Sequence, residues 1–404
     1  MKKISLLVIN VIFLSLIIFT FSYSAKLPIS PVEYVQDSDV LKFPYPYKAM
    51  LTICSDIDGT KLESFERYHT LLNTRGRVYD KYDGVGLDVA DTFWVYSGRS
   101  SKKSMAMFGG KNFKEPTFAE DIKKYWDMGY IDAIHSFGNF SKKGNITRRY
   151  AKKAWKAMQE YGVMPEIWIN HGDSNNVDNF GNVSMRYQQG DDKTSEAYHT
   201  DISIPNGIRF VWNSQGSDQF GMEYPLYPIT LLDGQKVWGF NRYTNEEIDG
   251  KVIWKWIPFC VNEVLSDENL QSLIDNEQYA IYANHLGSDK IYPHSVEAYE
   301  RLRKAQDDGD ILVARTSRLL KYAVAQKFMR FEKSINDDGT IVFNILSIDD
   351  PMLGEYIPTI EDLRGITFKS NRLAKITLCG VEISEEELIR DDGVIGIKWF
   401  ELIE

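Results

Sequence analysis

The chain has 404 residues, with 57 acidic and 47 basic side chains and a formal net charge of −10 at pH 7. An acidic chain with no basic run beyond its first residues does not suit nucleic acid, so we expect no nucleic-acid partner. The cysteines are Cys54, Cys260 and Cys379, an odd number spread far apart, which argues against a disulfide framework and a cysteine-rich metal site. We expect each to be a small, buried apolar residue.

Residues 1–25 have the layout of a secretory signal. Lys2 and Lys3 precede an apolar run over 4–21, and small residues follow it. The run is also about long enough to cross a bilayer, so an uncleaved anchor that tethers the protein to the membrane is the alternative. In either case we expect the rest of the chain outside the cytoplasm: secreted, periplasmic or held on the outer side of the membrane.

The chain from 49 to 325 consists of repeated strand and helix patterns. The run 49–54 has the length and apolar character of a strand that is buried on both faces. Further strands are predicted at 131–136, 166–170, 279–284 and 311–314, and helices at 118–128, 146–161, 295–306 and 317–325. This alternation predicts an α/β fold with a parallel sheet or barrel, and the residues from 173 to 265 are expected to form loops and short strands on one rim.

Beyond residue 328 the pattern becomes that of a β domain. Strand-length segments are predicted at 340–347, 365–369, 374–381 and 394–400, and only 384–390 is predicted to be a helix. We therefore expect a catalytic domain over 26–328, followed by a small β-sandwich-like accessory domain over 329–404.

Several predicted strands end in side chains that bind metals or transfer protons. These are Asp56 and Asp58 after 49–54, His135 and Asn139 after 131–134, His171 after 166–170, and His285 after 279–284. The carboxyl ends of parallel strands face one mouth of an α/β fold, so we expect these side chains to converge. Three of the six histidines share this placement, which favours a site, whereas His69, His199 and His294 are expected to be structural.

These segments resemble, in order, the motifs of NodB-homology polysaccharide deacetylases. The run Ser55-Asp56-Ile57-Asp58-Gly59 is similar to the family's T-F-D-D-G with one residue added, and the run from His135 to Asn139 resembles H-[ST]-x-x-H except at its last position. The strand that ends in His285, with the helix, glycine, strand and leucine-rich helix after it, resembles the final motif. The resemblance covers roughly 46–325 and implies a distorted (β/α)7–8 barrel.

The resemblance also implies a divalent metal, most often zinc, that is held by one aspartate and two histidines. Transferred position by position, Asp58 and His135 would be ligands, Asp56 the general base and His285 the general acid. The implied enzyme is a hydrolase that removes N- or O-acetyl groups from a cell-surface or extracellular polysaccharide.

The chain departs from the family pattern at two places. Asn139 stands where the family has its second metal histidine, so we expect His171 to be the third ligand with Asn139 beside it, because imidazole binds zinc far better than an amide does. The arginine-containing third motif is not recognisable, and the segment 168–172 takes its place.

Two other functions compete for the same residues. The run from Asp56 to Thr60 matches the D-x-D-G-T motif of haloacid-dehalogenase-like phosphatases, in which the first aspartate is the nucleophile and magnesium is bound. That family also needs a later acidic pair, and the best one, Asp349-Asp350, lies in the β-rich tail. The third possibility is a carbohydrate-binding protein with weakened catalysis. Asn139 supports it, whereas two close carboxylates are unfavourable without a cation.

Overall fold

The structure is a computed structural model that describes residues 39–79, 81–97, 105–109, 115–138, 140, 146–171, 176–181, 188–214, 216–217, 219–248, 251–254, 261–288 and 291–401. The signal or anchor expected at 1–25, Asn139 and Cys260 lie outside these residues. Within the described ranges, no helix combines the length and the apolar character needed to cross a membrane.

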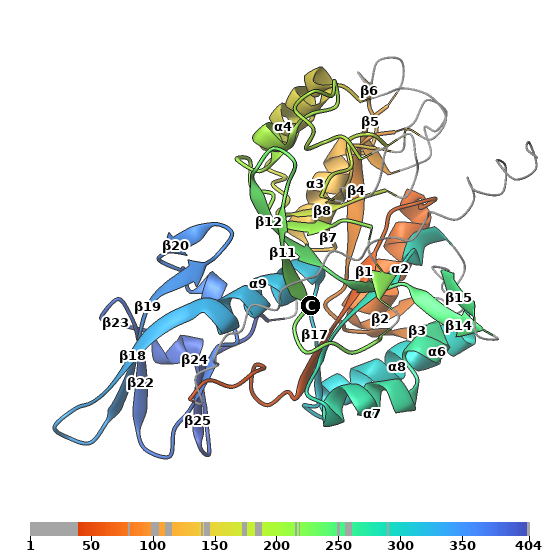
Figure 1. The fold of residues 1–404 in the computed structure, drawn as a ribbon. Helices are drawn as coiled ribbons and strands as arrows, with labels where there is room; N and C mark the ends of the chain where they lie inside the picture. The colour runs from red at the N-terminus through yellow and green to blue at the C-terminus, as the bar shows by residue number, and fades with distance from the viewer. Residues whose placement is uncertain are drawn as a thin grey trace, which may run out of the picture. The chain divides into compact units, whose positions relative to one another are not determined.

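Thirteen strands of the described chain form one sheet, which is mostly parallel (Figure 1). Its centre consists of β16 (Tyr279–Asn284), β1 (Ala49–Ser55), β4 (Ala90–Tyr96), β7 (Ile131–His135) and β8 (Ile167–Ile169), which pair in this order. Every residue of these five strands is buried, as expected of a parallel sheet that is covered on both faces. The predicted α/β class is therefore observed.

The strand pairing does not close into a ring among the described residues. At one end, β12 (Lys236–Phe240) pairs with β9 (Phe210–Trp212) and with β11 (Leu226–Thr230). At the other end, β13 (Arg242–Tyr243) pairs with β16 and with β10 (Gly216–Ser217). The observed architecture is a mixed α/β sheet, and closure into a (β/α)7–8 barrel stays a prediction.

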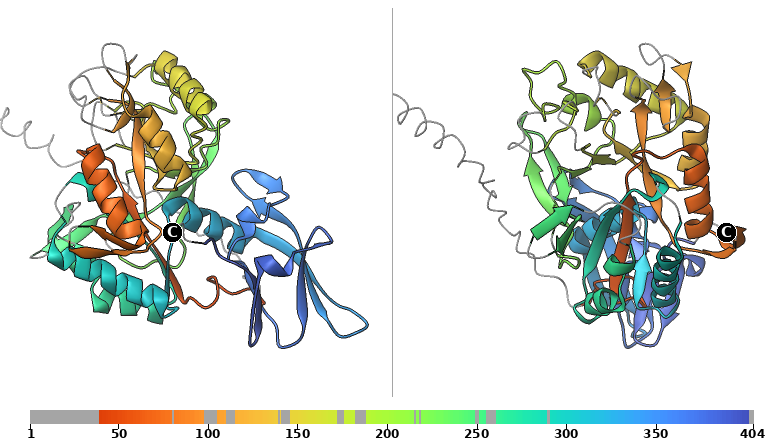
Figure 2. Two further views of the ribbon diagram at one scale, coloured as in Figure 1. Left: turned by 180° about the vertical axis from the view of Figure 1, so that it is seen from behind. Right: turned by 90° about the vertical axis from the view of Figure 1, so that its right-hand side faces the viewer.

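Amphipathic helices connect the strands and lie around them (Figures 1 and 2). In α4 (Arg148–Tyr161), the buried residues recur at helical spacing and include Ala151, Trp155 and Met158. The helix ends at Gly162, whose φ of 69° is in the left-handed region that a side chain disfavours, and its N–H bonds back to the Gln159 carbonyl. The other helices of the main sheet are α2 (Leu62–Asn73), α3 (Ala119–Asp127), α5 (Thr200–Ser203), α6 (Val261–Val264), α7 (Asp267–Asp275), α8 (Pro293–Asp307) and α9 (Thr316–Phe328).

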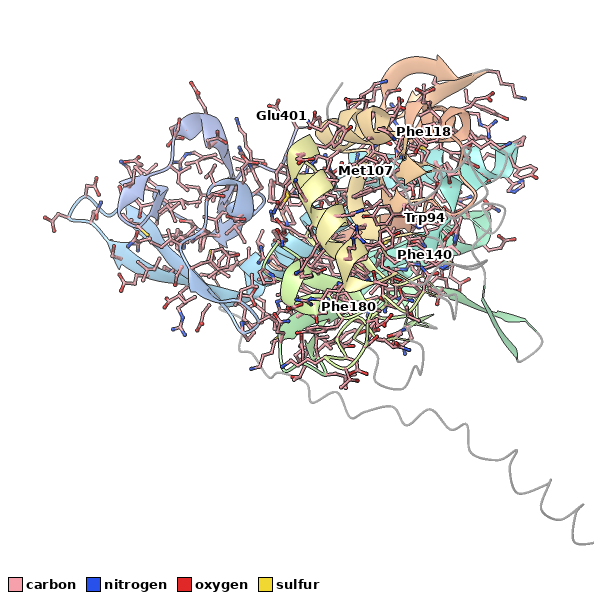
Figure 3. All side chains as sticks on the ribbon, turned by 90° about the horizontal axis from the view of Figure 1, so that it is seen from above. Trp94, Met107, Phe118, Phe140, Phe180 and Glu401 are labelled. Carbon is pink, nitrogen blue, oxygen red and sulfur yellow. The ribbon has the colours of Figure 1, made fainter. Side chains whose placement is uncertain are left out.

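Smaller strands complete this part of the chain. They are β2 (Arg75–Tyr79), β3 (Tyr82–Val85), β5 (Ala106–Gly109), β6 (Glu115–Pro116), β14 (Asn245–Ile248), β15 (Lys251–Trp254) and β17 (Ile311–Val313). Large side chains fill the interior between sheet and helices, and Trp94, Met107, Phe140 and Phe180 belong to one buried cluster there (Figure 3).

The C-terminal strands form two sheets. Five strands, β18 (Met329–Ile335), β19 (Ile341–Asp350), β20 (Gly354–Tyr356), β22 (Ala374–Leu378) and β23 (Val381–Glu382), form one; β21 (Thr367–Lys369), β25 (Val394–Ile397) and β24 (Leu388–Asp391) form the other. Phe343 of the first sheet and Phe368 of the second stack with ring centroids 4.3 Å apart, so the two sheets share one core.

Two predictions for this region are wrong. The segment 384–390 is not a helix, because only Glu385–Glu387 forms a 3-10 turn and the residues after it pair with β25 as strand β24. Cys379 is exposed and not buried, since it lies in the tight turn between β22 and β23 with a φ of 48°. Cys54 is buried as predicted, on β1.

Candidate metal centre

The centre of the site is the turn that follows β1. Asp56 donates its backbone N–H to the Asn284 carbonyl at 2.8 Å, which ties the end of β1 to the end of β16. The next N–H, that of Ile57, donates to the hydroxyl of Thr92 on β4 at 2.9 Å. Gly59 then turns the chain with a φ of 69°. These contacts hold Asp58 above the carboxyl ends of the central strands.

Three histidines from three other strand ends converge on Asp58. Nε2 of His135, at the end of β7, lies 2.9 Å from Oδ2 of Asp58, and Nε2 of His285, after β16, lies 3.3 Å from the same oxygen. Nε2 of His171, after β8, lies 3.2 Å from Oδ1. The convergence of these side chains follows from the parallel order of the strands, as the sequence predicted.

Asp58, His135 and His171 are positioned to hold a metal ion. Their donor atoms, one carboxylate oxygen and two imidazole nitrogens, all lie within 4.8 Å of one another. Donor atoms of Asp56, Asp58 and His285 form a second group with the same spacing. One carboxylate with two imidazoles is a donor set that leaves coordination positions open for water or substrate.

The hydrogen bonds around His171 also fit a cation. Its Nδ1 lies 3.2 Å from Oδ1 of Asn176, while its Nε2 faces the Asp58 carboxylate. The amide nitrogen of Asn176 is already used, because it donates to the Ser136 hydroxyl and to the Gly138 carbonyl, so the amide oxygen faces the ring. A neutral imidazole has one N–H, so His171 can donate to the Asn176 oxygen or to the Asp58 carboxylate but not to both. A cation between Nε2 and Asp58 would remove that conflict.

Asn176 joins the segments that carry two of the histidines. It is fully buried, and its bonds to Ser136 and Gly138 reach the turn that follows His135. Ser136 has a φ of 50°, which is strained for a residue with a side chain, and its N–H is held by the Ile169 carbonyl of β8. The turns after β7 and β8 are therefore fixed to each other.

Asp56 lies below this cluster and pairs with an arginine. Nη1 and Nη2 of Arg242, on β13, donate to the two oxygens of Asp56 at 2.7 and 2.8 Å. Asp56 is 3% exposed and Arg242 is 0% exposed, so the pair is shielded from water. The guanidinium also stacks on the Trp212 ring at 3.9 Å, which fixes its plane.

These contacts determine the charge of the site. Burial by itself would raise the pKa of Asp56, but the charge of Arg242, with His135 and the bidentate hydrogen bond, lowers it below its usual value. Burial by itself would also raise the pKa of Asp58. Instead, that pKa lies well below its usual range because of the charge and hydrogen bond of His135 and the hydrogen bonds of His171 and His285. Both carboxylates are therefore ionised at neutral pH.

The pKa of His285 shifts in the opposite direction and is raised. Burial alone would lower its pKa, but the hydrogen bond to Asp58 and the negative charges of Asp56 and Asp58 raise it. Its backbone N–H donates to the Asn284 side chain at 2.6 Å, which orients the residue just beyond β16. An imidazole held in this way favours its protonated form.

The remaining histidines lie away from the cluster. His69 on α2 is buried and bonds to Asn73, and burial lowers its pKa to about 4. His199 is buried between Ser203 and the Asp178 carbonyl, and His294 stacks on Tyr292 at the start of α8. Asn139, predicted beside the metal, lies outside the described residues.

Two residues of the site were not predicted from the sequence. Arg242 follows the apolar strand β12 by two positions, and an arginine directly after such a strand is the only signal that could have found it. Asn176 lies in a polar loop with no distinguishing pattern.

The chain matches no protein-family model, and no curated protein matches it. The resemblance to deacetylases therefore depends on the order of the motifs alone.

Proposed function

We propose that the protein is an exported, metal-dependent hydrolase that removes acetyl groups from a cell-surface or extracellular polysaccharide. The observation that carries this proposal is the convergence of His135, His171 and His285 on Asp58, directly beside an Asp56 that a buried arginine holds. The motif order along the chain supports the same function.

The donor set favours zinc. Imidazole nitrogen suits Zn²⁺, whereas Mg²⁺ prefers oxygen ligands alone. Bound by Asp58, His135 and His171, zinc would supply Lewis-acid chemistry for an amide or ester carbonyl and would acidify water. The Asn176 carbonyl oxygen, by accepting from Nδ1 of His171, leaves the Nε2 lone pair for the metal.

Asp56 is suited to act as the general base. Arg242 occupies both of its oxygens and keeps it ionised, so Asp56 can accept a proton from water without first losing one. Arg242 does not touch the reacting atoms in this scheme. It positions the carboxylate and holds its charge.

His285 is suited to act as the general acid. Its raised pKa favours the imidazolium, which can donate a proton to the departing amine or alkoxide. It lies across Asp58 from His171, with its Nε2 directed at the same carboxylate. Donor atoms of Asp56, Asp58 and His285 lie within 4.8 Å of one another, so the proposed base and acid are both adjacent to a proposed metal ligand.

We infer that the main sheet is a distorted barrel of the deacetylase type. β12 belongs to one end of the sheet and β13 to the other, and only Asn241 separates them in the chain. The run 236–243 thus bridges the two ends covalently, although the strands there do not pair with each other.

The phosphatase alternative has less support. The magnesium of that family prefers oxygen ligands, whereas the groups that face Asp58 are three imidazoles. The candidate acidic pair is used elsewhere: Asp350 accepts from the Trp238 indole at 3.0 Å, and Asp349 pairs with Arg330.

The test is acetate release by the zinc-loaded protein from N-acetylglucosamine oligomers and from an O-acetylated xylan. Asp56→Asn and His285→Ala are each expected to lower the rate by about 10²–10⁴-fold, the usual contribution of an acid or base. His294→Ala, which removes a histidine from the start of α8, is the matched control and should keep the parent rate.

Two outcomes would contradict the proposal. Magnesium-dependent hydrolysis of p-nitrophenyl phosphate that Asp56→Asn abolishes would establish the phosphatase. Glycan binding without acetate release by the zinc-loaded protein would establish a binding protein that has lost catalysis.

Asn176→Ala is expected to weaken zinc binding by about 10–100-fold, the usual effect of losing a residue that orients a metal-bound histidine. The change removes the acceptor for Nδ1 of His171 and the link to the turn after His135. Zinc affinity is measured by competition with a chromogenic chelator. Asn206→Ala, at a more exposed asparagine that bonds to the Ile202 carbonyl, should leave zinc affinity unchanged. Equal affinity of folded Asn176→Ala and parent protein would show that Asn176 has no orienting role.

A further inference from the structure

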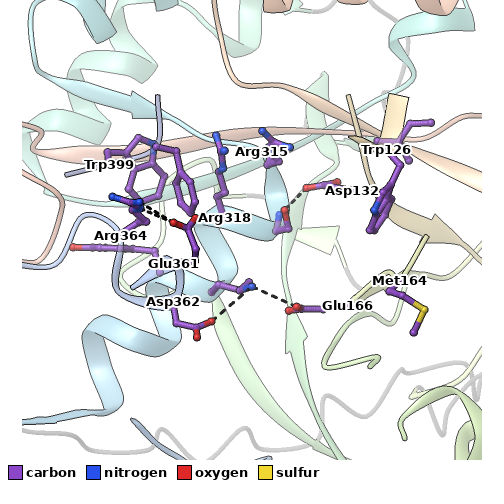
Figure 4. Close-up of a pocket in the computed structure, with 15 residues that line it drawn as sticks. Trp126, Asp132, Met164, Glu166, Arg315, Arg318, Glu361, Asp362, Arg364 and Trp399 are labelled. Carbon is purple, nitrogen blue, oxygen red and sulfur yellow. Dashed lines mark hydrogen bonds and ion pairs between the residues drawn. The ribbon is translucent and has the colours of Figure 1, made fainter. Parts of the chain in front are cut away.

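A second pocket lies away from the metal centre, between the main sheet and the C-terminal strands (Figure 4). Asp132 at the start of β7 and Glu166 just before β8 line it, whereas His135 and His171 lie at the other ends of those strands. At about 3.3 Å per residue, Asp132 is roughly 10 Å from His135 along β7. We call this space the lower pocket.

The size of the lower pocket suits a small ligand. Its volume is about 310 Å³, near the low end of the range of roughly 300–1,000 Å³ for small-molecule sites. Residues from the C-terminal part of the chain, such as Glu361 and Trp399, complete a wall that the main sheet alone would leave open. Sites at the junction of two parts of a chain are common for ligands.

The charges of the lower pocket are balanced. Four basic and four acidic side chains line it, so the formal charges cancel and neither an anion nor a cation is favoured overall. Most of these side chains are paired: Arg318 bonds to Asp88 at 2.7 Å, and Arg364 bonds to Glu361 at 2.8 Å. The lining therefore offers many polar atoms to a neutral ligand without strong attraction for an ion.

Lys321 is the polar group best placed to bind such a ligand. Its ammonium lies between Glu166 at 3.4 Å and Asp362 at 3.8 Å, and both distances exceed the usual 2.7–2.9 Å of a charged hydrogen bond. An ammonium has three N–H donors, so Lys321 can donate to a hydroxyl while both carboxylates accept from hydroxyls nearby. A polyhydroxylated molecule matches this pattern of donors and acceptors.

Aromatic rings provide the apolar surfaces. Trp126, at the end of α3, and Trp399 lie on opposite sides of the lower pocket (Figure 4). Phe400 carries the Arg318 guanidinium on its face at 3.8 Å, which fixes another flat surface in the wall. Rings beside fixed polar groups match a sugar, which has apolar C–H faces and a rim of hydroxyls.

We propose that the lower pocket binds a neutral sugar unit of a glycan chain, as a second glycan site separate from the metal centre. The choice of a glycan rests on the proposed function, since a polymer held at one site can present another of its units to the metal. The site would retain the polymer between successive reactions.

The test uses Asp58→Asn protein, which removes turnover, and isothermal titration with tetramers of glucose, mannose and N-acetylglucosamine. At least one tetramer is expected to bind. Adding Lys321→Met should weaken that binding by about tenfold, the typical worth of one hydrogen bond to a charged group. Trp126→Ala on α3 should weaken tetramer binding independently. This variant keeps the test valid if Lys321→Met does not fold. Lys156→Met, which breaks a lysine–glutamate pair on the surface of α4, is the matched control.

Failure of all three tetramers to bind, or binding that neither Lys321→Met nor Trp126→Ala weakens, would overturn the inference. Because the measurement is made without catalysis, its outcome is separate from that of the proposed function. Tetramer binding that depends on Lys321, together with no acetate release by the zinc-loaded parent protein, would support the lower pocket and reject the hydrolase.

Discussion

The Asp58→Asn protein is expected to lose its metal ion and all measurable acetate release. All three histidines face Asp58, and it is a carboxylate whose pKa lies well below its usual range because of them. An amide of the same shape cannot balance the charge of a divalent cation. Zinc affinity should fall by more than about 100-fold, since even the loss of a residue that only orients a metal ligand lowers the affinity by roughly 10–100-fold.

The measurements are metal content by mass spectrometry after dialysis and acetate release at saturating substrate. Asp310→Asn is the matched control, because it removes an aspartate from a surface pair with Lys48 at 2.8 Å. It should retain one zinc per chain and the parent rate. An Asp58→Asn protein that still holds one zinc at parent affinity would show that the ion binds elsewhere.

Arg242→Met is expected to destabilise the protein by about 3–5 kcal/mol, the usual cost of removing one partner from a buried ion pair. The change leaves the Asp56 carboxylate buried without its bidentate partner. Without Arg242, the effect of burial on the pKa of Asp56 is opposed less, so that pKa should rise. The acidic limb of the pH profile should then move to higher pH, because activity is lost as pH falls through the raised pKa.

The experiments are urea unfolding and the pH dependence of kcat/KM. Arg242→Lys keeps the positive charge but cannot donate to both oxygens in one plane, so both effects should be smaller. In Arg242→Met with Asp56→Asn, neither charge of the pair remains, and part of the lost stability should return. Arg390→Met removes a bidentate arginine from an exposed pair with Glu385 and should cost less than about 1 kcal/mol. An Arg242→Met protein with parent stability and pH profile would reject the positioning role.

The two aspartates of the turn therefore have different environments although only Ile57 separates them. Asp56 faces a fixed cation in a buried pair, and Asp58 faces imidazoles at the mouth of the sheet. Two carboxylates that differ in this way can have different roles, one as a base and the other as a ligand. The sequence could not distinguish them, because the partner of Asp56 is 186 residues away.

Local pattern in the sequence was sufficient for the α/β class and for the aspartate and the three histidines that meet. The runs that became β1, β7, β8 and β16 are apolar over strand length, and each is followed by its polar residue. Parallel strands end at one edge, so their order in the chain already implied that Asp58, His135, His171 and His285 converge. These predictions needed only periodicity and the geometry of a parallel sheet.

Contacts between residues far apart in the sequence decided the order of the strands and the other residues of the site. Strand β4 lies between β1 and β7 and supplies Thr92 to the turn that carries Asp56 and Asp58. It was not predicted, because neither its partners nor its place in the sheet is visible in its own seven residues. The segment 384–390 has three glutamates that favour a helix, but pairing of Leu388–Asp391 with β25 made it a strand. Arg242 and Asn176 reach the site only through the packing of β13 and a polar loop. The energies that place them come from burial and hydrogen bonds to distant residues, which no local window of sequence contains.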